Sequence, residues 1–171
     1  MKRYFMPCES DEDFARASSF MLEHRYDLHP SFGTLDVVTL MYGYITEGHL
    51  LLAIGEGGAL AGIAAYYQGT REQEFRDREV ALVDMVIFGR EHRGTRMFLM
   101  GLNYLIDHIT EKHPEVTEIR LAALASNGYL CRLYGKIMDR CGSRMGTHGE
   151  EIIFCSKVNN FRAILEKWNK V

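Results

Sequence analysis

The sequence lacks the long apolar stretches that would carry a chain into or across a membrane. No run approaches the roughly 20 apolar residues of a membrane span, and the stretch MKRYFMPCESDED is not apolar enough for a signal peptide. An excess of basic residues is also absent, because the formal net charge is -3. No general positive field therefore draws the chain to nucleic acid or anionic lipid. We expect a cytoplasmic protein without nucleic-acid or membrane partners, in which any anion site is local.

Cysteines are few and irregularly spaced. They are Cys8, Cys131, Cys141 and Cys155, and no two of them have C-x-x-C spacing. This pattern argues against a zinc site and against a disulfide framework. We therefore expect four reduced thiols, with Cys131 and Cys141 as packing residues of a helix, and no bound metal.

Internal repeats, low-complexity segments and linkers are missing as well. A chain of 171 residues suits one domain with a single core, so we expect one domain over 1–171. Apolar periodicity and turn residues predict alternating strands and helices. Strands are expected at 2–6, 49–56, 59–69, 80–88 and 117–124 and twice within 143–158, and helices at about 10–24, 34–46, 94–112, 126–142 and 159–170. The charged segment 71–79 is interpreted as a solvated hairpin tip.

The most informative stretch is 80–109, where an apolar run ends in a basic, glycine-containing turn and an amphipathic helix follows. The first turn of a helix presents backbone N–H groups without helical partners and a partial positive charge. Arg90, Arg93 and Arg96 lie beside this turn in the sequence. The stretch is therefore suited to a ligand that carries phosphate.

Asp84 is an isolated carboxylate in the apolar strand 80–88. Burying a charge is costly and usually has a reason. Asp84 is either a functional group or a buried carboxylate that is hydrogen-bonded to a neighbouring loop, and the sequence leaves both interpretations open. Asn127 or Ser126 is expected to cap the helix that follows.

The order of elements and two motifs resemble the GNAT acyltransferases (Gcn5-related N-acetyltransferases). The first motif, Arg93-Gly94-Thr95-Arg96-Met97-Phe98, resembles the family's Arg/Gln-x-x-Gly-x-Gly/Ala loop. It departs from that loop because Arg96 and Phe98 stand where small residues are expected. The second motif lies within 126–142 and comprises Asn127, Tyr129, Leu133, Tyr134 and Lys136.

The resemblance implies an α/β (α+β) fold with a central mixed, mostly antiparallel sheet of six to seven strands flanked by helices. It also implies acetyl-CoA as the acyl donor. The pyrophosphate would bind the loop amides, the pantetheine arm would pair with the backbone at the end of strand 80–88, and Asn127 would touch that arm. The residues expected to line acetyl-CoA are Met85, Val86, Ile87, His92, Arg93, Gly94, Thr95, Arg96 and Asn127.

The implied reaction moves an acetyl group from acetyl-CoA to the amine of a small molecule or protein by direct attack in a ternary complex. An alkyl amine of pKa about 10.4 is neutral in only about one molecule in 2,500 at pH 7, so a base assists. Asp84 is the first candidate for the base and Glu79 the second, while Tyr134 would protonate the leaving thiolate. Two alternatives stay open: a GNAT-like binding or regulatory module without catalysis, and an acyltransferase with another thioester donor. The acceptor is unknown, and a homodimer is also left open.

Overall fold

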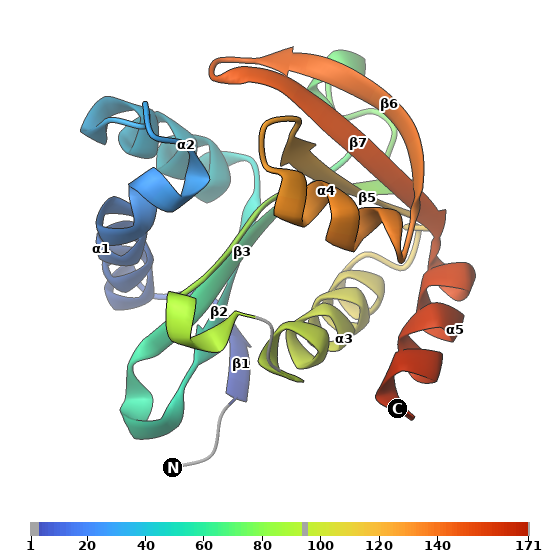
Figure 1. Ribbon diagram of the computed structural model, residues 1–171, viewed down its shortest axis with the longest axis horizontal. Helices are drawn as coiled ribbons and strands as arrows, with labels where there is room; N and C mark the ends of the chain where they lie inside the picture. The colour runs from blue at the N-terminus through green and yellow to red at the C-terminus, as the bar shows by residue number, and fades with distance from the viewer. Residues whose placement is uncertain (1–3, 94–95, 171) are drawn as a thin grey trace. The chain divides into compact units, whose positions relative to one another are not determined.

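The computed structural model describes residues 4–93 and 96–170, and Figure 1 shows its arrangement of helices and strands. The strands are β1 (Tyr4–Pro7), β2 (His49–Ile54), β3 (Leu60–Gln68), β4 (Val80–Phe88), β5 (Glu118–Leu124), β6 (Asp139–Gly146) and β7 (Gly149–Lys157). The α-helices are α1 (Asp11–Leu28), α2 (Thr34–Thr46), α3 (Arg96–Lys112), α4 (Gly128–Gly135) and α5 (Val158–Asn169). Short 3-10 turns occupy Glu56–Gly58, Arg71–Gln73 and Arg90–His92.

The strands form one seven-stranded sheet in the order β1-β2-β3-β4-β5-β7-β6. The pair β4–β5 is parallel, whereas β1–β2, β2–β3, β5–β7 and β6–β7 are antiparallel. The predicted mixed, mostly antiparallel sheet flanked by helices is therefore confirmed. The chain divides into two compact units, one of residues 1–66 and 86–101 and one of residues 67–85 and 102–171. The expectation of one domain over 1–171 stays a prediction.

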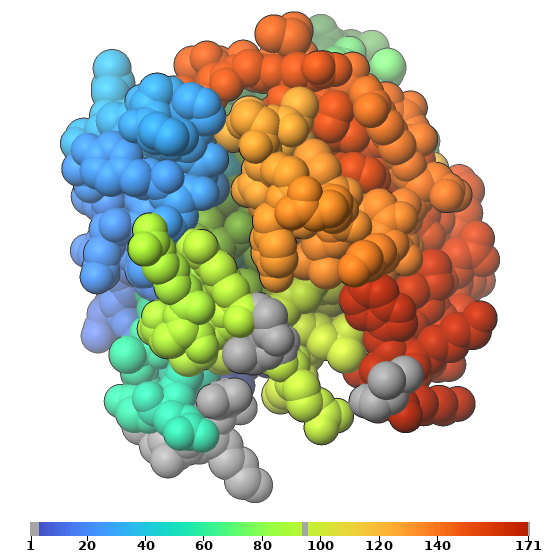
Figure 2. All heavy atoms as spheres, viewed as in Figure 1, coloured from blue at the N-terminus to red at the C-terminus, as the bar shows by residue number. Residues whose placement is uncertain are grey.

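In the first unit, local signals set the helix starts. The Ser10 hydroxyl accepts a hydrogen bond from the Asp13 N–H (3.1 Å), and the Asp13 carboxylate accepts one from the Ser10 N–H (3.2 Å). This reciprocal capping box begins α1 where the sequence predicted it. The helix runs on to Leu28, past the predicted end near His24. Residues 25–28 are therefore helical, beyond the expected end of the helix. Both α1 and α2 lie at the surface in the space-filling view (Figure 2).

The core of the first unit requires a glycine on β3. Ala53, Ala61 and Met97 form a buried cluster on which Phe5 and Phe88 pack. A Cβ atom added to Gly62 would lie 2.6 Å from the Phe88 ring and 2.8 Å from the Ile87 carbonyl oxygen. The backbone of β3 can approach β4 this closely only because position 62 has no side chain.

In the second unit, β5 is central and pairs with β4 on one edge and β7 on the other. The segment 71–79 between β3 and β4 is mostly exposed, as expected of a solvated hairpin tip, and side-chain contacts hold it in place. The Thr70 N–H and hydroxyl donate to the two Asp77 carboxylate oxygens at 2.7 and 2.8 Å. Gly69, at φ +85°, lets the backbone of Phe75 approach to 2.8 Å of where a Cβ would stand.

The predicted helix 126–142 is wrong in its second half. The helix ends at Gly135, and residues from Asp139 onward pair with β7. Cys141 therefore lies in a strand, at an irregularity of the β6–β7 register, and forms a disulfide with Cys155. The two Cα atoms are 6.0 Å apart, within the range that a disulfide spans. The expectation of reduced thiols is wrong for this pair, whereas Cys8 and Cys131 are free.

Candidate active site

The parallel ladder between β4 and β5 is short. It joins Val80–Val83 to Glu118–Leu121, although β4 continues to Phe88 and β5 to Leu124. In contrast, β5 stays paired with β7 from Glu118 to Leu124. Asp84, the predicted base, is the first β4 residue beyond the ladder. From this residue onward the backbone of β4 is no longer paired with β5.

Asp84 belongs to a three-residue ion-pair cluster. Arg144 Nη2 donates to Asp84 Oδ1 at 2.6 Å, and Arg144 Nε donates to Glu151 Oε2 at 2.6 Å. The side chains of Asp84, Arg144 and Glu151 are 16%, 23% and 22% exposed. Burial lowers the pKa of Arg144, but Asp84 and Glu151 outweigh that effect, and the net shift of the pKa is upward. Two carboxylates therefore share one guanidinium.

The strand register explains how this cluster forms. Arg144 and Glu151 stand directly opposite each other on β6 and β7, and oppositely charged cross-strand neighbours attract. Glu151 is not among the site residues predicted from the sequence. The sequence did carry a signal for it, because residues 144 and 151 lie symmetrically about Gly146–Gly149, between the two strands expected within 143–158.

The structure does not bring Glu79, the second candidate base, to Asp84. Glu79 precedes β4, and five extended residues separate two positions by about 16 Å. Its side chain is exposed. Its carbonyl oxygen accepts hydrogen bonds from the N–H groups of Thr117 (2.8 Å) and Glu118 (3.1 Å). Glu79 therefore fixes the start of the β4–β5 pair.

Tyr134, the predicted acid, lies in the last turn of α4 and is 1% exposed. Its ring packs edge-on against Phe154, with centroids 5.9 Å apart. Burial, with smaller contributions from Cys131 and Tyr129, raises the pKa of Tyr134. The phenol is therefore protonated throughout the neutral range, and its raised pKa makes it a weaker acid than an exposed tyrosine. Asn127 caps this helix as predicted, because its side-chain oxygen accepts from the Leu130 N–H at 3.1 Å.

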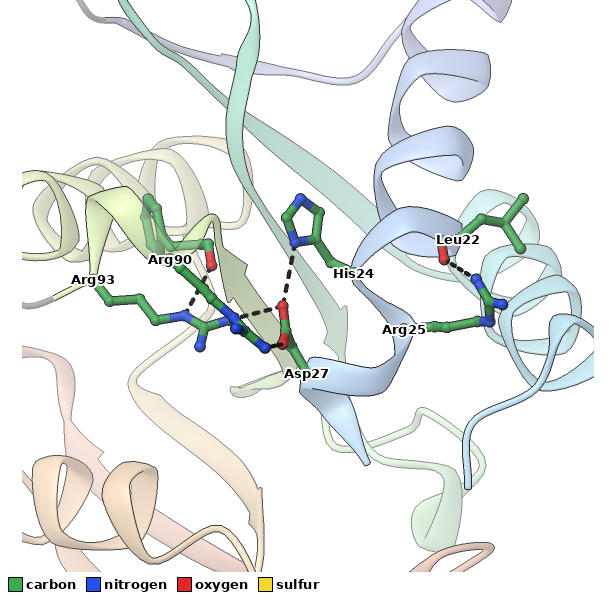
Figure 3. Close-up of polar contacts among 7 residues, drawn as sticks. Leu22, His24, Arg25, Asp27, Arg90 and Arg93 are labelled. Atoms are coloured by element: carbon green, nitrogen blue, oxygen red, sulfur yellow. Dashed lines mark hydrogen bonds and ion pairs between the residues drawn. The ribbon is translucent and has the colours of Figure 1, made fainter. Parts of the chain in front are cut away.

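The basic turn before α3 is fastened to the last turn of α1 (Figure 3). Arg93 Nη2 lies 3.0 Å from Asp27 Oδ2, and Arg93 Nε donates to the Phe88 carbonyl oxygen at 3.1 Å. Arg90 Nη2 lies 3.4 Å from Asp27 Oδ1, and His24 Nδ1 lies 3.3 Å from Oδ2. Burial alone would raise the pKa of Asp27, but the His24 hydrogen bond and the two arginines hold it below its ordinary value.

This arrangement gives Arg93 a structural role, since its guanidinium joins the end of β4 to α1. Gly94 and Thr95 lie outside the described residues. Arg96 is exposed at the start of α3. His92 is partly buried, with Nε2 3.5 Å from a Glu91 carboxylate oxygen. Phe98 packs edge-on to Phe88, with centroids 6.1 Å apart, which explains a large residue where the motif has a small one.

The three β4 residues expected along the pantetheine arm offer mainly backbone. Met85 and Ile87 have buried side chains, and Val86 between them is partly exposed. A ligand along this segment would therefore meet N–H and C=O groups. Within residues 4–93 and 96–170, no group of three or more His, Cys, Asp or Glu side chains is placed to hold a metal ion. In the same ranges no helix is long and apolar enough to span a membrane.

Comparison with known proteins gives matches only at the level of structure. No protein-family model matches the chain, and no curated protein sequence matches it. The aminoglycoside acetyltransferase AAC(6')-Ib, solved with coenzyme A and kanamycin, superposes with a TM-score of 0.72 at 18% identity. That match covers 95% of this chain and 98% of the other.

Two further structures agree with this result. Spermidine N-acetyltransferase from Vibrio cholerae, solved with CoA and spermine, matches with a TM-score of 0.65 at 12% identity, over 94% of this chain and 98% of its own. An acetyltransferase of the GNAT family from Streptococcus pneumoniae matches with a TM-score of 0.63 at 14% identity, over 91% and 99%. At such identities the likeness concerns architecture. The chain therefore has the fold of the GNAT acetyltransferases.

Proposed function

We propose that the chain is an acyl-CoA-dependent N-acetyltransferase that acts by direct attack in a ternary complex. The observation that carries the proposal is the end of the β4–β5 ladder at Val83 and Leu121, with the carboxylate of Asp84 as the next β4 residue. An extended ligand can pair with backbone that a neighbouring strand has left. The related folds support the proposal because their solved complexes contain CoA and amines.

The donor would bind along chain segments that the family resemblance identifies. The amides of the pantetheine arm would pair with the backbone of 85–87, and the pyrophosphate would meet the N–H groups of 93–96. A backbone N–H of β4 would stabilise the oxyanion that forms at the thioester carbonyl. Arg93 would contribute by holding the turn, because Asp27 and Phe88 already engage its guanidinium.

The chemistry uses Asp84 and Tyr134. Asp84 takes a proton from the ammonium form of the acceptor, directly or through water, and the neutral nitrogen attacks the thioester carbonyl carbon. A C–N bond forms and the C–S bond breaks. The amine loses its second proton to solvent, and Tyr134 donates its phenolic proton to the leaving sulfur. Solvent then returns a proton to Tyr134, and Asp84 releases the proton that it took.

The charge of the cluster indicates the class of acceptor. Asp84 and Glu151 carry two negative charges against the single positive charge of Arg144. A cationic amine would be attracted to these carboxylates, whereas an anionic acceptor would be repelled by them. Kanamycin and spermine in the compared complexes are amines of this kind.

Donor binding is tested by thermal shift with acetyl-CoA and with free CoA. A ligand at a hundredfold excess over its Kd stabilises a protein by about 2.7 kcal/mol. At about 2–4 °C per kcal/mol for a chain of this size, the expected rise in Tm is about 5–11 °C. No shift at millimolar acetyl-CoA would overturn the donor assignment and favour another thioester.

Catalysis is tested by thiol release with a panel of polyamines, aminoglycosides and a lysine peptide. Asp84→Asn is expected to lower turnover by about 10²-fold, within the range of general-base effects, while the thermal shift with acetyl-CoA persists. Asp107→Asn is the matched control, because Asp107 pairs with Arg162 on the outside of α3 and α5. A clear shift with acetyl-CoA but no thiol release with any amine would support a binding module instead.

A further inference from the structure

Helix α2 carries a second apolar row beside its buried one. Val37, Met41 and Tyr44 are buried. On the adjoining side, four large apolar side chains are 46% to 77% exposed, and we refer to them as the α2 face: Leu35, Val38, Tyr42 and Ile45. The apolar part of α2 is therefore wider than the side that the chain itself covers. An exposed apolar face of this kind marks an interaction surface.

The polar groups near the α2 face are directed back into the helix. The hydroxyl of Thr39 donates to the Leu35 carbonyl oxygen (2.9 Å), and that of Thr46 donates to the Tyr42 carbonyl oxygen (2.7 Å). Asp36 is the sole charged residue in Thr34–Thr46, and its carboxylate accepts the Gly33 N–H at 2.7 Å. The α2 face is therefore neutral, and its neighbouring threonines have their hydroxyls occupied.

The other exposed large apolar residues lie one on each element. Among the described residues they are Tyr4 on β1, Tyr26 on α1, Met100 on α3, Tyr129 on α4 and Met145 on β6. The Arg25 guanidinium lies over the Tyr26 ring, 4.3 Å from its centroid. Single apolar residues on a surface need no explanation, whereas a row of four on one helix does. Figure 2 shows α2, light blue at the upper left, at the surface where another molecule can reach it.

We propose that the α2 face is the contact between two copies of this chain, with α2 antiparallel to α2 across a twofold axis. The spacing of its residues, 35, 38, 42 and 45, is the 3-4-3 spacing with which one helix packs along another. A twofold axis sets identical patches against each other. A charged patch would repel its copy, but the neutral α2 face does not.

Two other occupants fit less well. Helices that lie on anionic membranes carry Lys or Arg beside their apolar side, and α2 contains neither. A cationic amine acceptor would need a carboxylate, and the α2 face offers none. A second copy needs only the complementary apolar row that the chain itself provides.

The size of the α2 face sets the expected strength of the dimer. Partial burial of one tyrosine and three aliphatic side chains removes about 400 Å² from water on each copy. The pair would then bury about 800 Å², less than the 1,200–2,000 Å² of stable complexes. We therefore expect a reversible dimer with a Kd in the micromolar range, visible at high protein concentration.

Sedimentation velocity from about 1 to 500 µM tests the dimer. The mass is expected to rise from 19.6 kDa toward twice that value. The double variant Val38→Glu/Tyr42→Glu should stay monomeric at all concentrations with an unchanged Tm at low concentration, because both side chains are exposed in the single chain. Met145→Glu is the matched control, since Met145 is 78% exposed on β6, and it should dimerise like the parent.

Orientation is tested by oxidative cross-linking. In an antiparallel pair, position 35 of one copy lies opposite 45 of the other. A mixture of Leu35→Cys and Ile45→Cys chains should therefore cross-link more than either variant alone. A monomer at 500 µM, or a dimer that survives Val38→Glu/Tyr42→Glu, would overturn the proposal. So would a monomer that binds phosphatidylserine vesicles through the same residues, since the α2 face would then be a lipid contact.

Discussion

Replacing Arg144 by glutamine should destabilise the protein at neutral pH because it removes one charge and leaves two. Asp84 and Glu151 both contact the guanidinium at 2.6 Å. Without it, two partly buried carboxylates lose the guanidinium that both of them contact. The cost arises less from lost attraction than from the charges left behind.

The magnitude follows from the burial of the three side chains. Breaking a fully buried pair costs about 3–5 kcal/mol, and exposed pairs are worth about 0–1 kcal/mol. With side chains 16% to 23% exposed, we expect a loss of about 2 kcal/mol, which lowers Tm by about 4–8 °C.

Urea denaturation of four chains measures this effect. Arg144→Gln should lose about 2 kcal/mol, Glu151→Gln less than about 1 kcal/mol, and the double variant less than Arg144→Gln alone, because the residues are coupled. Arg162→Gln is the control, since its pair with Asp107 is solvent-exposed and worth little. The reasoning is refuted if Arg144→Gln and the parent have the same free energy of unfolding at pH 7. It is also refuted if the loss in the double variant equals the sum of the two single losses.

Three further predictions concern single residues. Tyr134→Phe keeps the ring packing but should slow thiol release at least about tenfold. Because burial raises the pKa of Tyr134, the phenol of the parent should stay protonated up to about pH 9. An unchanged rate in the variant would exclude Tyr134 as the proton donor. Asp27→Asn should lower the free energy of unfolding in urea by about 1 kcal/mol. Since the pKa of Asp27 is lowered by its partners, this difference from the parent should be constant from pH 8 to 5 and be lost below about pH 4. A difference that persists below pH 4 would contradict the prediction. Cys141→Ser should lower the free energy of unfolding by up to about 3 kcal/mol, the value for a closed loop of similar length. Alkylation should label Cys8 and Cys131 before reduction and all four cysteines afterwards. Four labelled thiols without reductant would rule out the disulfide.

Features set by neighbours in the sequence were predictable. The bounds of α2 and β4 match the expected 34–46 and 80–88, and the Ser10–Asp13 capping box was readable from residue types alone. Asn127 was likewise recognisable as a helix cap. In each case the interaction lies within a few residues of chain, where apolar spacing and side-chain chemistry suffice.

Features set by distant partners were not predictable. Residues 139–142 continue a helical apolar pattern, but pairing with β7 makes them a strand. The contact of Asp27 with Arg93 requires knowing where α1 ends relative to β4. The roles of Asp84 as base and Tyr134 as acid stay predictions. The structure gives their contacts, their burial and the direction of the pKa shift of Tyr134, whereas a catalytic role is measured in the reaction.

Gly62 has a consequence for comparing this chain with its relatives. A side chain at this position would collide with the Phe88 ring and the Ile87 carbonyl, so an alignment of relatives is expected to retain glycine there. Such an invariant column, beside the strand that carries Asp84, would resemble a catalytic signature. The reason for the invariance would be steric. A ranking of residues for mutagenesis by invariance alone would therefore place Gly62, which has no side chain, among the candidate catalytic residues.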